Sequence, residues 1–148
     1  MKIVKAEKEF IFDENPSAPS CHASTVLPLD GGKTVLSAWF AGAKEGEDDV
    51  GIWFSKRTDG KWSAPVLLTT EKDVPHWNPV LFKREDSSII LYYKFGKHIP
   101  YWQTRYIISK DNGETWSQPY DIVKDDTTGG RGPVKNKCIR ISNGDVLA

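Results

Sequence analysis

Short runs of apolar residues alternate with clusters of turn-forming residues along most of the chain. The runs are rich in Val, Ile, Tyr, Phe and Trp, and Gly, Asp, Asn and Pro bound them, which is typical of β-strands. No stretch has the i, i+3, i+4, i+7 spacing of an amphipathic helix. The pattern therefore predicts strands near residues 23–29, 34–40, 49–56, 62–69, 78–84, 88–95, 102–109 and 116–123.

The pattern also repeats, with an ungapped period of 54 residues. Equivalent pairs at this offset are His22 and His76, Gly42 and Gly96, Ser55 and Ser109, Trp62 and Trp116, and Pro65 and Pro119. A third copy begins at residues 138–147 with a strand, a turn and a strand. Four antiparallel strands in a repeat of this length indicate a β-propeller blade. A β-sandwich is the structural alternative, but it does not predict an ungapped repeat.

The clearest turn in the repeat is Ser109-Lys-Asp-Asn-Gly-Glu-Thr-Trp116. Asp and Asn side chains bond to nearby backbone, and Gly accepts a positive φ without a steric penalty. The first repeat carries a degenerate copy over residues 55–62, in which Arg57 stands where Asp111 does.

Composition narrows the class of protein. Lys and Arg balance Asp and Glu, so we expect no bulk attraction to nucleic acid or to an anionic membrane. The first nine residues are too charged for a secretory signal, and no run approaches the length of a membrane span. Two distant cysteines imply no disulfide framework. A cytoplasmic location is therefore the expectation.

We expect one all-β propeller domain over residues 1–148. It divides into a lead-in over 1–20, blade one over 21–70, blade two over 76–124 and the start of blade three over 131–148. Two blades and part of a third do not close a ring, so the chain is interpreted as the front portion of a longer protein. The alternative is a short unit that completes its ring by self-association.

Strand parity separates two rims of such a propeller, because successive loops of an up-and-down blade alternate between its ends. The Ser109–Trp116 turn lies on one rim, which we call the turn rim. The opposite rim, called the site rim, receives the entry to each blade and the loop between its second and third strands. It collects all three His, an acidic cluster over 44–49 and a basic cluster over 131–137.

These features resemble the sialidase superfamily, specifically its branch with bacterial neuraminidase repeats. The Ser-x-Asp-x-Gly-x-Thr-Trp turn corresponds to the Asp-box, and Gly130-Arg-Gly-Pro-Val-Lys-Asn-Lys137 is similar to the entry to the third blade. The resemblance runs from about residue 20 to the end and implies a six-bladed propeller. It implies an arginine triad for the substrate carboxylate, a loop aspartate as acid/base and a Tyr nucleophile. The family's first arginine, in an Arg-Ile-Pro motif, is replaced here by His22-Ala-Ser.

The predicted catalytic residues lie in blade one. The resemblance places Asp48 or Asp49 at the acid/base position, with Glu45 alongside, and crowded carboxylates raise one another's pKa as a general acid requires. A solvated acidic loop is the alternative. His22 is a further candidate, for proton transfer or sugar binding, and an inter-blade hydrogen bond is the alternative for both His22 and His76. No metal site is predicted, because two His lack a clear third ligand, and no cofactor is predicted.

The predicted substrate-binding residues would hold an acidic sugar through charge, hydroxyl contacts and stacking. They are His76, Asn78, Lys94, Trp102, Arg131, Lys135, Asn136 and Lys137. Lys97, Trp77 and Tyr101 could contribute, although aromatic residues in blades more often form core.

Three functions fit the sequence. The first is a sialidase-like glycoside hydrolase acting on an acidic terminal sugar. The second is a lyase acting on uronic-acid polysaccharide, in which His22 or His76 takes the proton. The third is a non-catalytic carbohydrate-binding propeller, which the missing Arg-Ile-Pro motif favours. Carbohydrate is the predicted partner in all three.

Overall fold

The computed structural model describes residues 6–13, 18–126 and 128–148, and this part of the chain is all-β. Parts of the expected lead-in, residues 1–5 and 14–17, lie outside the described residues. The first sheet has the order β1-β2-β3-β4, with β5 also paired to β3. Its strands are β1 (Ser20–Leu29), β2 (Thr34–Gly42), β3 (Gly51–Thr58), β4 (Lys61–Trp62) and β5 (Val66–Leu67).

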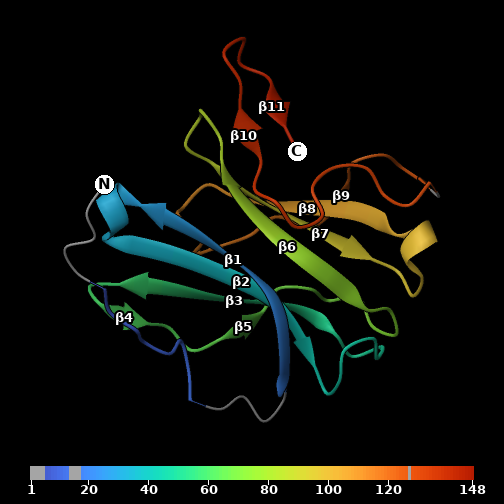
Figure 1. Cartoon of the computed structure of the whole chain (residues 1–148), viewed down its shortest axis with the longest axis horizontal. Coiled ribbons are helices and arrows are strands. Elements are labelled where there is room, and N and C mark those ends of the chain that lie inside the picture. Colours follow the sequence, from blue (N-terminus) through green and yellow to red (C-terminus); the bar gives the residue numbers. More distant parts are fainter. Residues whose placement is uncertain (1–5, 14–17, 127) are drawn as a thin grey trace.

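The second sheet has the order β6-β7-β8-β9, and a separate hairpin pairs β10 with β11. The strands are β6 (His76–Lys83), β7 (Ile89–Phe95), β8 (Gln103–Ser109), β9 (Tyr120–Asp121), β10 (Ile139–Arg140) and β11 (Val146–Leu147). Two 3-10 turns, η1 (Asp30–Gly32) and η2 (Ile99–Tyr101), interrupt the loops. Neighbouring strands within each sheet are antiparallel, as the sequence predicts (Figure 1).

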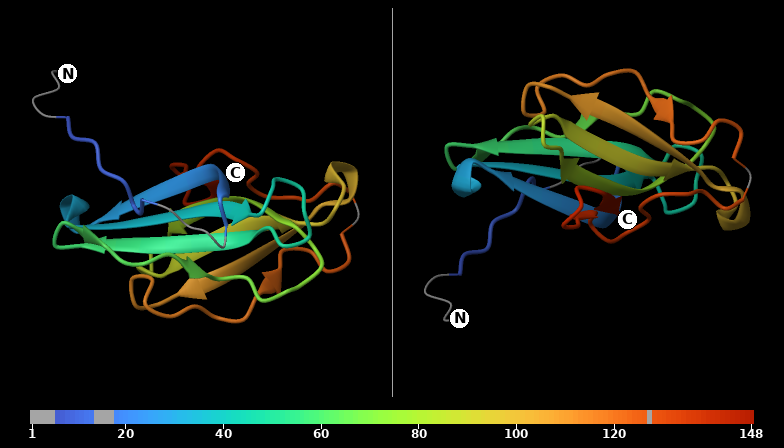
Figure 2. Two further views of the ribbon diagram at one scale, coloured as in Figure 1. Left: turned by 90° about the horizontal axis from the view of Figure 1, so that it is seen from below. Right: turned by 90° about the horizontal axis from the view of Figure 1, so that it is seen from above.

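The two sheets pack face to face and enclose the main core (Figure 2). Leu36 and Phe54 from the first sheet join Leu81, Leu91 and Ile107 from the second, and all five are buried. The inner strands β1 and β6 are also linked, since the backbone N–H of Leu81 donates to the hydroxyl of Thr25. Alternate residues of each strand face this core, so burial of apolar area stabilises the stacked blades.

The fourth strand of each blade is much shorter than the sequence pattern predicts. Pro65 and Pro119 interrupt the two runs, and proline cannot donate to a strand ladder. Before each proline a serine hydroxyl takes the place of a backbone partner: Ser63 accepts from the N–H of Lys56, and Ser117 accepts from the N–H of Ile108. The outer edge of each blade is therefore held by serine side chains together with a few backbone hydrogen bonds.

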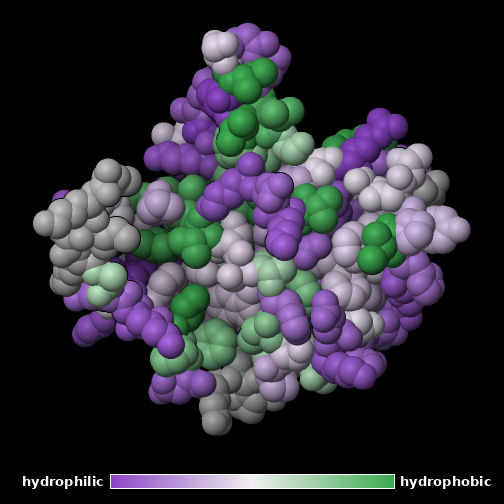
Figure 3. Space-filling view, viewed as in Figure 1, coloured by the Kyte–Doolittle hydropathy of each residue, from purple (hydrophilic) through white to green (hydrophobic). Residues whose placement is uncertain are grey.

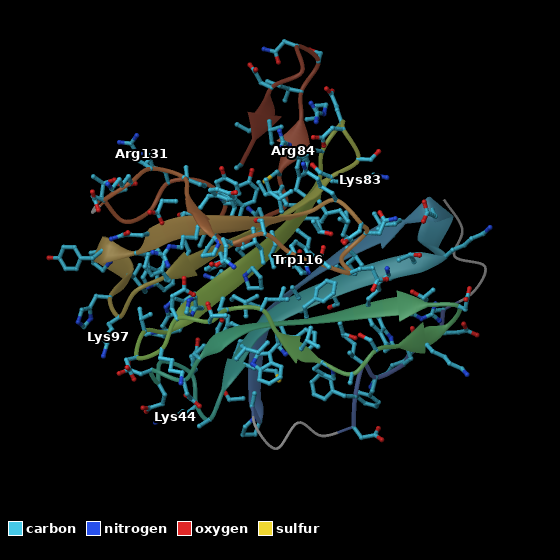
Figure 4. The ribbon with its side chains drawn as sticks, turned by 180° about the vertical axis from the view of Figure 1, so that it is seen from behind. Lys44, Lys83, Arg84, Lys97, Trp116 and Arg131 are labelled. Atoms are coloured by element: carbon cyan, nitrogen blue, oxygen red, sulfur yellow. The ribbon has the colours of Figure 1, made fainter. Side chains whose placement is uncertain are left out.

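The turn over residues 109–116 has the internal bonding that its sequence predicts. The hydroxyl of Ser109 donates to Asp111 and accepts from the N–H of Gly113. The carboxylate of Asp111 accepts from both the N–H and the hydroxyl of Thr115. Trp116 then packs edge-on against Phe54 of the first sheet, at 5.5 Å between centroids, and lies between the blades in Figure 4. The turn thus joins two blades.

Apolar side chains gather on the β10–β11 hairpin, which projects from the two sheets (Figure 3). Ile139, Val146 and Leu147 are all exposed there. No helix in the described ranges is long and apolar enough to cross a membrane.

Candidate functional site

The loops of the site rim meet at one end of the two blades. Figure 4 shows Lys44, Lys97 and Arg131 at this end, whereas Lys83 and Arg84 lie at the other. A pocket of about 630 Å³ opens there between the blades. Its lining combines rings, an amide, one carboxylate and two ammonium groups: His22, Ala23, Phe40, Glu45, Trp77, Asn78, Lys97, Ile99, Trp102 and Lys135.

Each inner strand bulges where it lines the pocket. The register of β1 shifts between His22 and Thr25, and that of β6 shifts between Trp77 and Val80. Ala23 and Asn78, inside these bulges, have φ of 49° and 48°, which L-residues rarely adopt. Such backbone costs about 1–3 kcal/mol and concentrates at functional sites. The two matched bulges therefore mark this pocket as the candidate site.

A row of rings runs along the pocket from blade one to blade two. His22 stacks on Phe40 at 5.4 Å between centroids, Phe40 meets Trp77 edge-on at 5.4 Å, and Trp77 stacks on Trp102 at 5.3 Å.

Both indole N–H groups of this row donate to one acceptor. The carbonyl of Gly96 lies 2.9 Å from Nε1 of Trp77 and 3.1 Å from Nε1 of Trp102. The two rings are thereby fixed in orientation before any ligand binds. Phe40 and Trp102 are buried within the row, so His22 and the half-buried Trp77 are the rings that can present a face to a sugar.

Polar groups lie around these rings. Nε2 of His22 is 3.1 Å from the hydroxyl of Ser20 and 3.9 Å from Oε2 of Glu45. Lys97 and Lys135 add two positive charges, and Lys97 contacts Asp48 at 2.7 Å. The pocket can thus offer a carboxylate, an imidazole and the ammonium of Lys135 to one ligand.

The structure brings only one of the three predicted acids to this pocket. Glu45 lines it, whereas Asp48 and Asp49 line a separate hollow of about 660 Å³ beside residues 67–73. Oδ2 of Asp49 accepts from the N–H of Ala43 at 2.8 Å and closes the loop between β2 and β3. An acid/base role for Asp48 or Asp49 stays a prediction that this placement does not support.

His76 does not lie beside His22 on the rim, and the prediction that it binds substrate there is wrong. Its side chain is fully buried between the sheets, with Nδ1 3.2 Å from the carbonyl of Val50. Nε2 is 3.4 Å from Glu71, which also pairs with Arg105 at 2.5 Å. Burial lowers the pKa of His76, against the opposing effects of the Val50 carbonyl and Glu71.

Lys94 is likewise buried, so it does not contact substrate as predicted. Its ammonium donates to the hydroxyl of Thr104 and to backbone carbonyls of residues 130–132. The charge is satisfied by protein oxygen atoms.

Only one residue of the basic cluster over 131–137 lines the pocket. Lys135 lines the pocket, whereas Lys137 donates to the carbonyl of Val26 on β1. Arg131 is exposed beside Asp126, at 3.6 Å, and Asn136 is exposed outside the pocket lining.

Three further lining residues, Ala23, Phe40 and Ile99, were not predicted. Phe40 ends a strand that reads as core, and no sequence signal predicts a positive φ at an alanine. No group of three or more His, Cys, Asp or Glu within the described ranges is arranged to hold a metal ion.

Comparison with known proteins gives one family and several similar folds. The model of the BNR repeat-like domain matches residues 33–148. Among solved structures, Hadza microbial sialidase Hz136 aligns with a TM-score of 0.69 at 15% identity, covering 86% of this chain and 31% of that one. A protein of unknown function from Dyadobacter fermentans aligns with a TM-score of 0.62 at 14% identity, covering 90% and 46%.

The α-L-arabinanase of Penicillium chrysogenum, complexed with arabinobiose, aligns with a TM-score of 0.50 at 14% identity, covering 89% of this chain and 34% of that one. The chain therefore spans less than half the length of each of these proteins. At these identities the likeness shows the fold alone. No curated protein matches the sequence.

Proposed function

The chain belongs to the BNR repeat-like domain family, and on that premise we propose that its site-rim pocket binds an acidic carbohydrate in a propeller that acts on glycans. The observation that carries the proposal is the preformed row of rings, in which buried Phe40 and Trp102 hold the more accessible His22 and Trp77 beside groups that can bond to hydroxyls and carboxylates. Two solved structures of similar fold are named as a sialidase and as an arabinanase with bound arabinobiose, which supports a carbohydrate ligand.

The rings supply affinity for a sugar. A pyranose has an apolar face of C–H groups, and Trp rings cover such faces while their fixed orientation limits the entropy lost on binding. The amide of Asn78 and the imidazole of His22 lie beside the rings, where they can bond to ring hydroxyls. An uncharged sugar would use these groups alone.

A lysine of the pocket favours a negatively charged sugar. Lys97 and Lys135 come from different blades and both line the pocket, although Lys97 is paired with Asp48 at 2.7 Å, so Lys135 is the cation that faces the pocket beside the carboxylate of Glu45. No arginine is among the lining residues within the described part of the chain. A ligand carboxylate would therefore be held by a point charge, without the bidentate geometry of a guanidinium.

Glu45 is the lining acid best placed to act on a bound glycoside. Its carboxyl group faces the pocket beside His22, so it can donate a proton to the leaving oxygen of a hydrolysed bond. In this hydrolase hypothesis the nucleophile comes from outside the described pocket, and the activity belongs to the whole propeller.

A uronate lyase is the second candidate, and the His22–Glu45 pair favours it. In elimination, Nε2 of His22 would take the proton from the carbon next to the sugar carboxylate, and the bond to the leaving oxygen would then break. Glu45, at 3.9 Å, would stabilise the resulting imidazolium, and a lysine would neutralise the substrate carboxylate.

Titration of the folded protein with matched sugars tests the binding proposal. Sialyllactose and oligogalacturonate should shift the indole signals of Trp77 and Trp102 in NMR spectra, whereas lactose should bind more weakly. Equal or absent responses to all three sugars would contradict the proposal. With a full propeller, new reducing ends would indicate hydrolysis and an unsaturated product would indicate elimination.

A further inference from the structure

Lys94 is a fully buried cation on β7, paired in the sheet with the lining residue Trp77 of β6. It lies at the end of β7, 54 residues after Phe40, and so takes the repeat position that Phe40 holds in blade one. Phe40 contacts the next blade entry through Trp77. Lys94 makes the equivalent contact with residues 130–132, the entry to blade three, but it uses an ammonium group where Phe40 uses a ring.

Oxygen atoms surround this ammonium. Nζ of Lys94 donates to Oγ1 of Thr104 at 2.6 Å and to the carbonyls of Gly130, Arg131 and Gly132 at 3.0, 2.9 and 3.4 Å. The Thr104 hydroxyl also donates to the carbonyl of Arg131. Three consecutive carbonyls therefore converge on one charge, an arrangement that an apolar side chain cannot reproduce.

The glycines allow this close approach. Gly130 has φ of +75°, and a Cβ there would lie 2.6 Å from the carbonyl oxygen of Trp102 and 3.2 Å from Nζ of Lys94. At Gly132 a Cβ would lie 2.7 Å from Ile122. The backbone at Gly130 is thus held against that of Trp102 with no room for a side chain, whereas at Gly132 the flexible end of Ile122 would have to move.

This segment connects directly to the pocket. A Cβ at the neighbouring Gly129 would lie 3.5 Å from the carbonyl oxygen of Pro100 in η2, the turn that carries the lining residue Ile99. Lys135, which also lines the pocket, follows three residues after Gly132. Fixing residues 130–132 therefore sets the position of one wall of the pocket.

We propose that Lys94 is a positioning residue, whose buried ammonium orders the segment 130–132 and thereby places Lys135 for ligand binding. This inference rests on the proposed carbohydrate function. Lys94 does not touch the ligand, so its effect on affinity passes through the segment.

The charge state of Lys94 provides a readout that a purely structural residue would lack. Burial lowers the pKa of Lys94 to about 8, and the nearby carboxylate of Asp126 acts in the opposite direction. The other charged group facing this segment is the exposed guanidinium of Arg131, paired with Asp126. Loss of the proton as the pH rises through about 8 removes the charge and one donor from the three carbonyls.

The fold and the site should respond differently to removal of this charge. The pKa of Lys94 is about 8 in the folded protein and 10.5 in the unfolded chain. The free energy of unfolding therefore decreases as the pH falls from about 10.5 to about 8, where the buried lysine becomes charged. Lys94→Met removes this desolvation cost but also leaves the three carbonyls without their donor, so the two effects on the melting temperature oppose each other. The variant should nevertheless free the segment 130–132.

The test compares Lys94→Met with wild type and with Lys83→Met, a matched control at the turn rim (Figure 4). Amide hydrogen exchange over residues 129–137 should accelerate at least about tenfold in Lys94→Met alone, the factor that corresponds to about 1.4 kcal/mol of local opening. Affinity for oligogalacturonate should fall by a similar factor. Wild-type affinity should decline more steeply than that of Lys94→Met as the pH rises through about 8.

Gly130→Ala moves the same segment while leaving the ammonium in place, and it should also weaken binding. If Lys94→Met loses the fold, this variant and the wild-type pH profile still test the inference. Unchanged exchange and affinity in both variants would overturn it. If no sugar binds the wild type, the proposed function fails, whereas the exchange experiment still decides whether Lys94 orders the segment.

Discussion

The carbonyl oxygen of Val50 in blade one accepts two hydrogen bonds from His76 in blade two. The backbone N–H lies 2.9 Å away and Nδ1 of the imidazole 3.2 Å away. Because the acceptor is a carbonyl, Nδ1 carries the proton in the folded protein. A single residue thus joins the two sheets at the start of β6, away from the ligand pocket.

Replacing His76 by Leu should destabilise the protein by about 1–3 kcal/mol, because a buried polar contact between blades is lost. The pKa of His76 is lowered on folding, so its contribution is complete above the unfolded value near 6.5 and is lost as the pH falls through the lower folded value. Urea unfolding at neutral and mildly acidic pH should show a smaller pH dependence for His76→Leu. His22→Ala, at an exposed position, is the control and should unfold like wild type.

Asp111 should stabilise the fold without affecting the site. Its bonds with Thr115 and Ser109 lower its pKa to about 2, so its contribution is present above about 3.8 and is lost as the pH falls through about 2. Asp111→Ala should lower the melting temperature at pH 7 and leave carbohydrate affinity unchanged. Lys110→Ala, in the same turn, should change neither. A loss of affinity in a folded Asp111→Ala protein would place the functional site on the wrong rim.

Alanine substitutions at Gly113 and Gly144 should distinguish the cost of backbone strain from the cost of a steric clash. Gly113 and Gly144 have φ of +87° and +91°, so alanine costs about 1–2 kcal/mol of conformational energy at either position. A Cβ at Gly113 would also lie 2.8 Å from Phe54, whereas none of the protein lies within 4 Å of one at Gly144. Denaturant unfolding should therefore show the larger loss for Gly113→Ala, by about 1–3 kcal/mol. Equal losses would mean that the Asp-box turn does not pack tightly on blade one.

Trp77 should dominate ligand affinity. Trp77→Ala removes one of the two inner rings of the row and should weaken oligogalacturonate binding by at least about tenfold, as is usual for an aromatic anchor that a ligand covers. Trp77→Phe, which keeps a ring, should recover part of the affinity. Tyr120→Ala removes an exposed ring stacked on Tyr106, outside the pocket lining, and should have no effect. Calorimetric titration measures all three, and an unaffected Trp77→Ala protein would contradict the proposed site.

The repeat and its strand periodicity are sufficient to predict the fold, whereas the functional role of the site rim stays a prediction. The 54-residue period predicts the inner strands β1 and β6 and the turns over residues 55–62 and 109–116, because local sequence patterns determine these elements. Strand lengths were less predictable: Pro65 and Pro119 were visible in the sequence, but the serine contacts that replace the ladder are tertiary. The alternation of loops between the two ends of a blade also predicts that His22, Asn78, Trp102 and Lys135 lie at the same end, and all four line the pocket there.

Sequence position alone does not predict which way a side chain turns. His76 and Lys94 lie at blade entries or loop ends, as predicted, but each turns into the protein and bonds to a backbone carbonyl. Asp49 also turns back into the protein, where its carboxylate accepts a hydrogen bond from the N–H of Ala43 within its own loop. Charged residues at a rim can satisfy backbone groups as readily as ligands, and only the three-dimensional packing distinguishes the two cases.

The row of rings crosses the boundary between the two repeats, which constrains how this site arose. His22 and Phe40 belong to the first repeat, and Trp77 and Trp102 belong to the second. A single ancestral blade would have held no such pocket. The two copies also differ in what one repeat position does, since it is the ring of Phe40 in blade one and the buried cation Lys94 in blade two. Selection on ligand binding would therefore act on pairs of adjacent blades, so that one blade could not be exchanged between relatives without its neighbour.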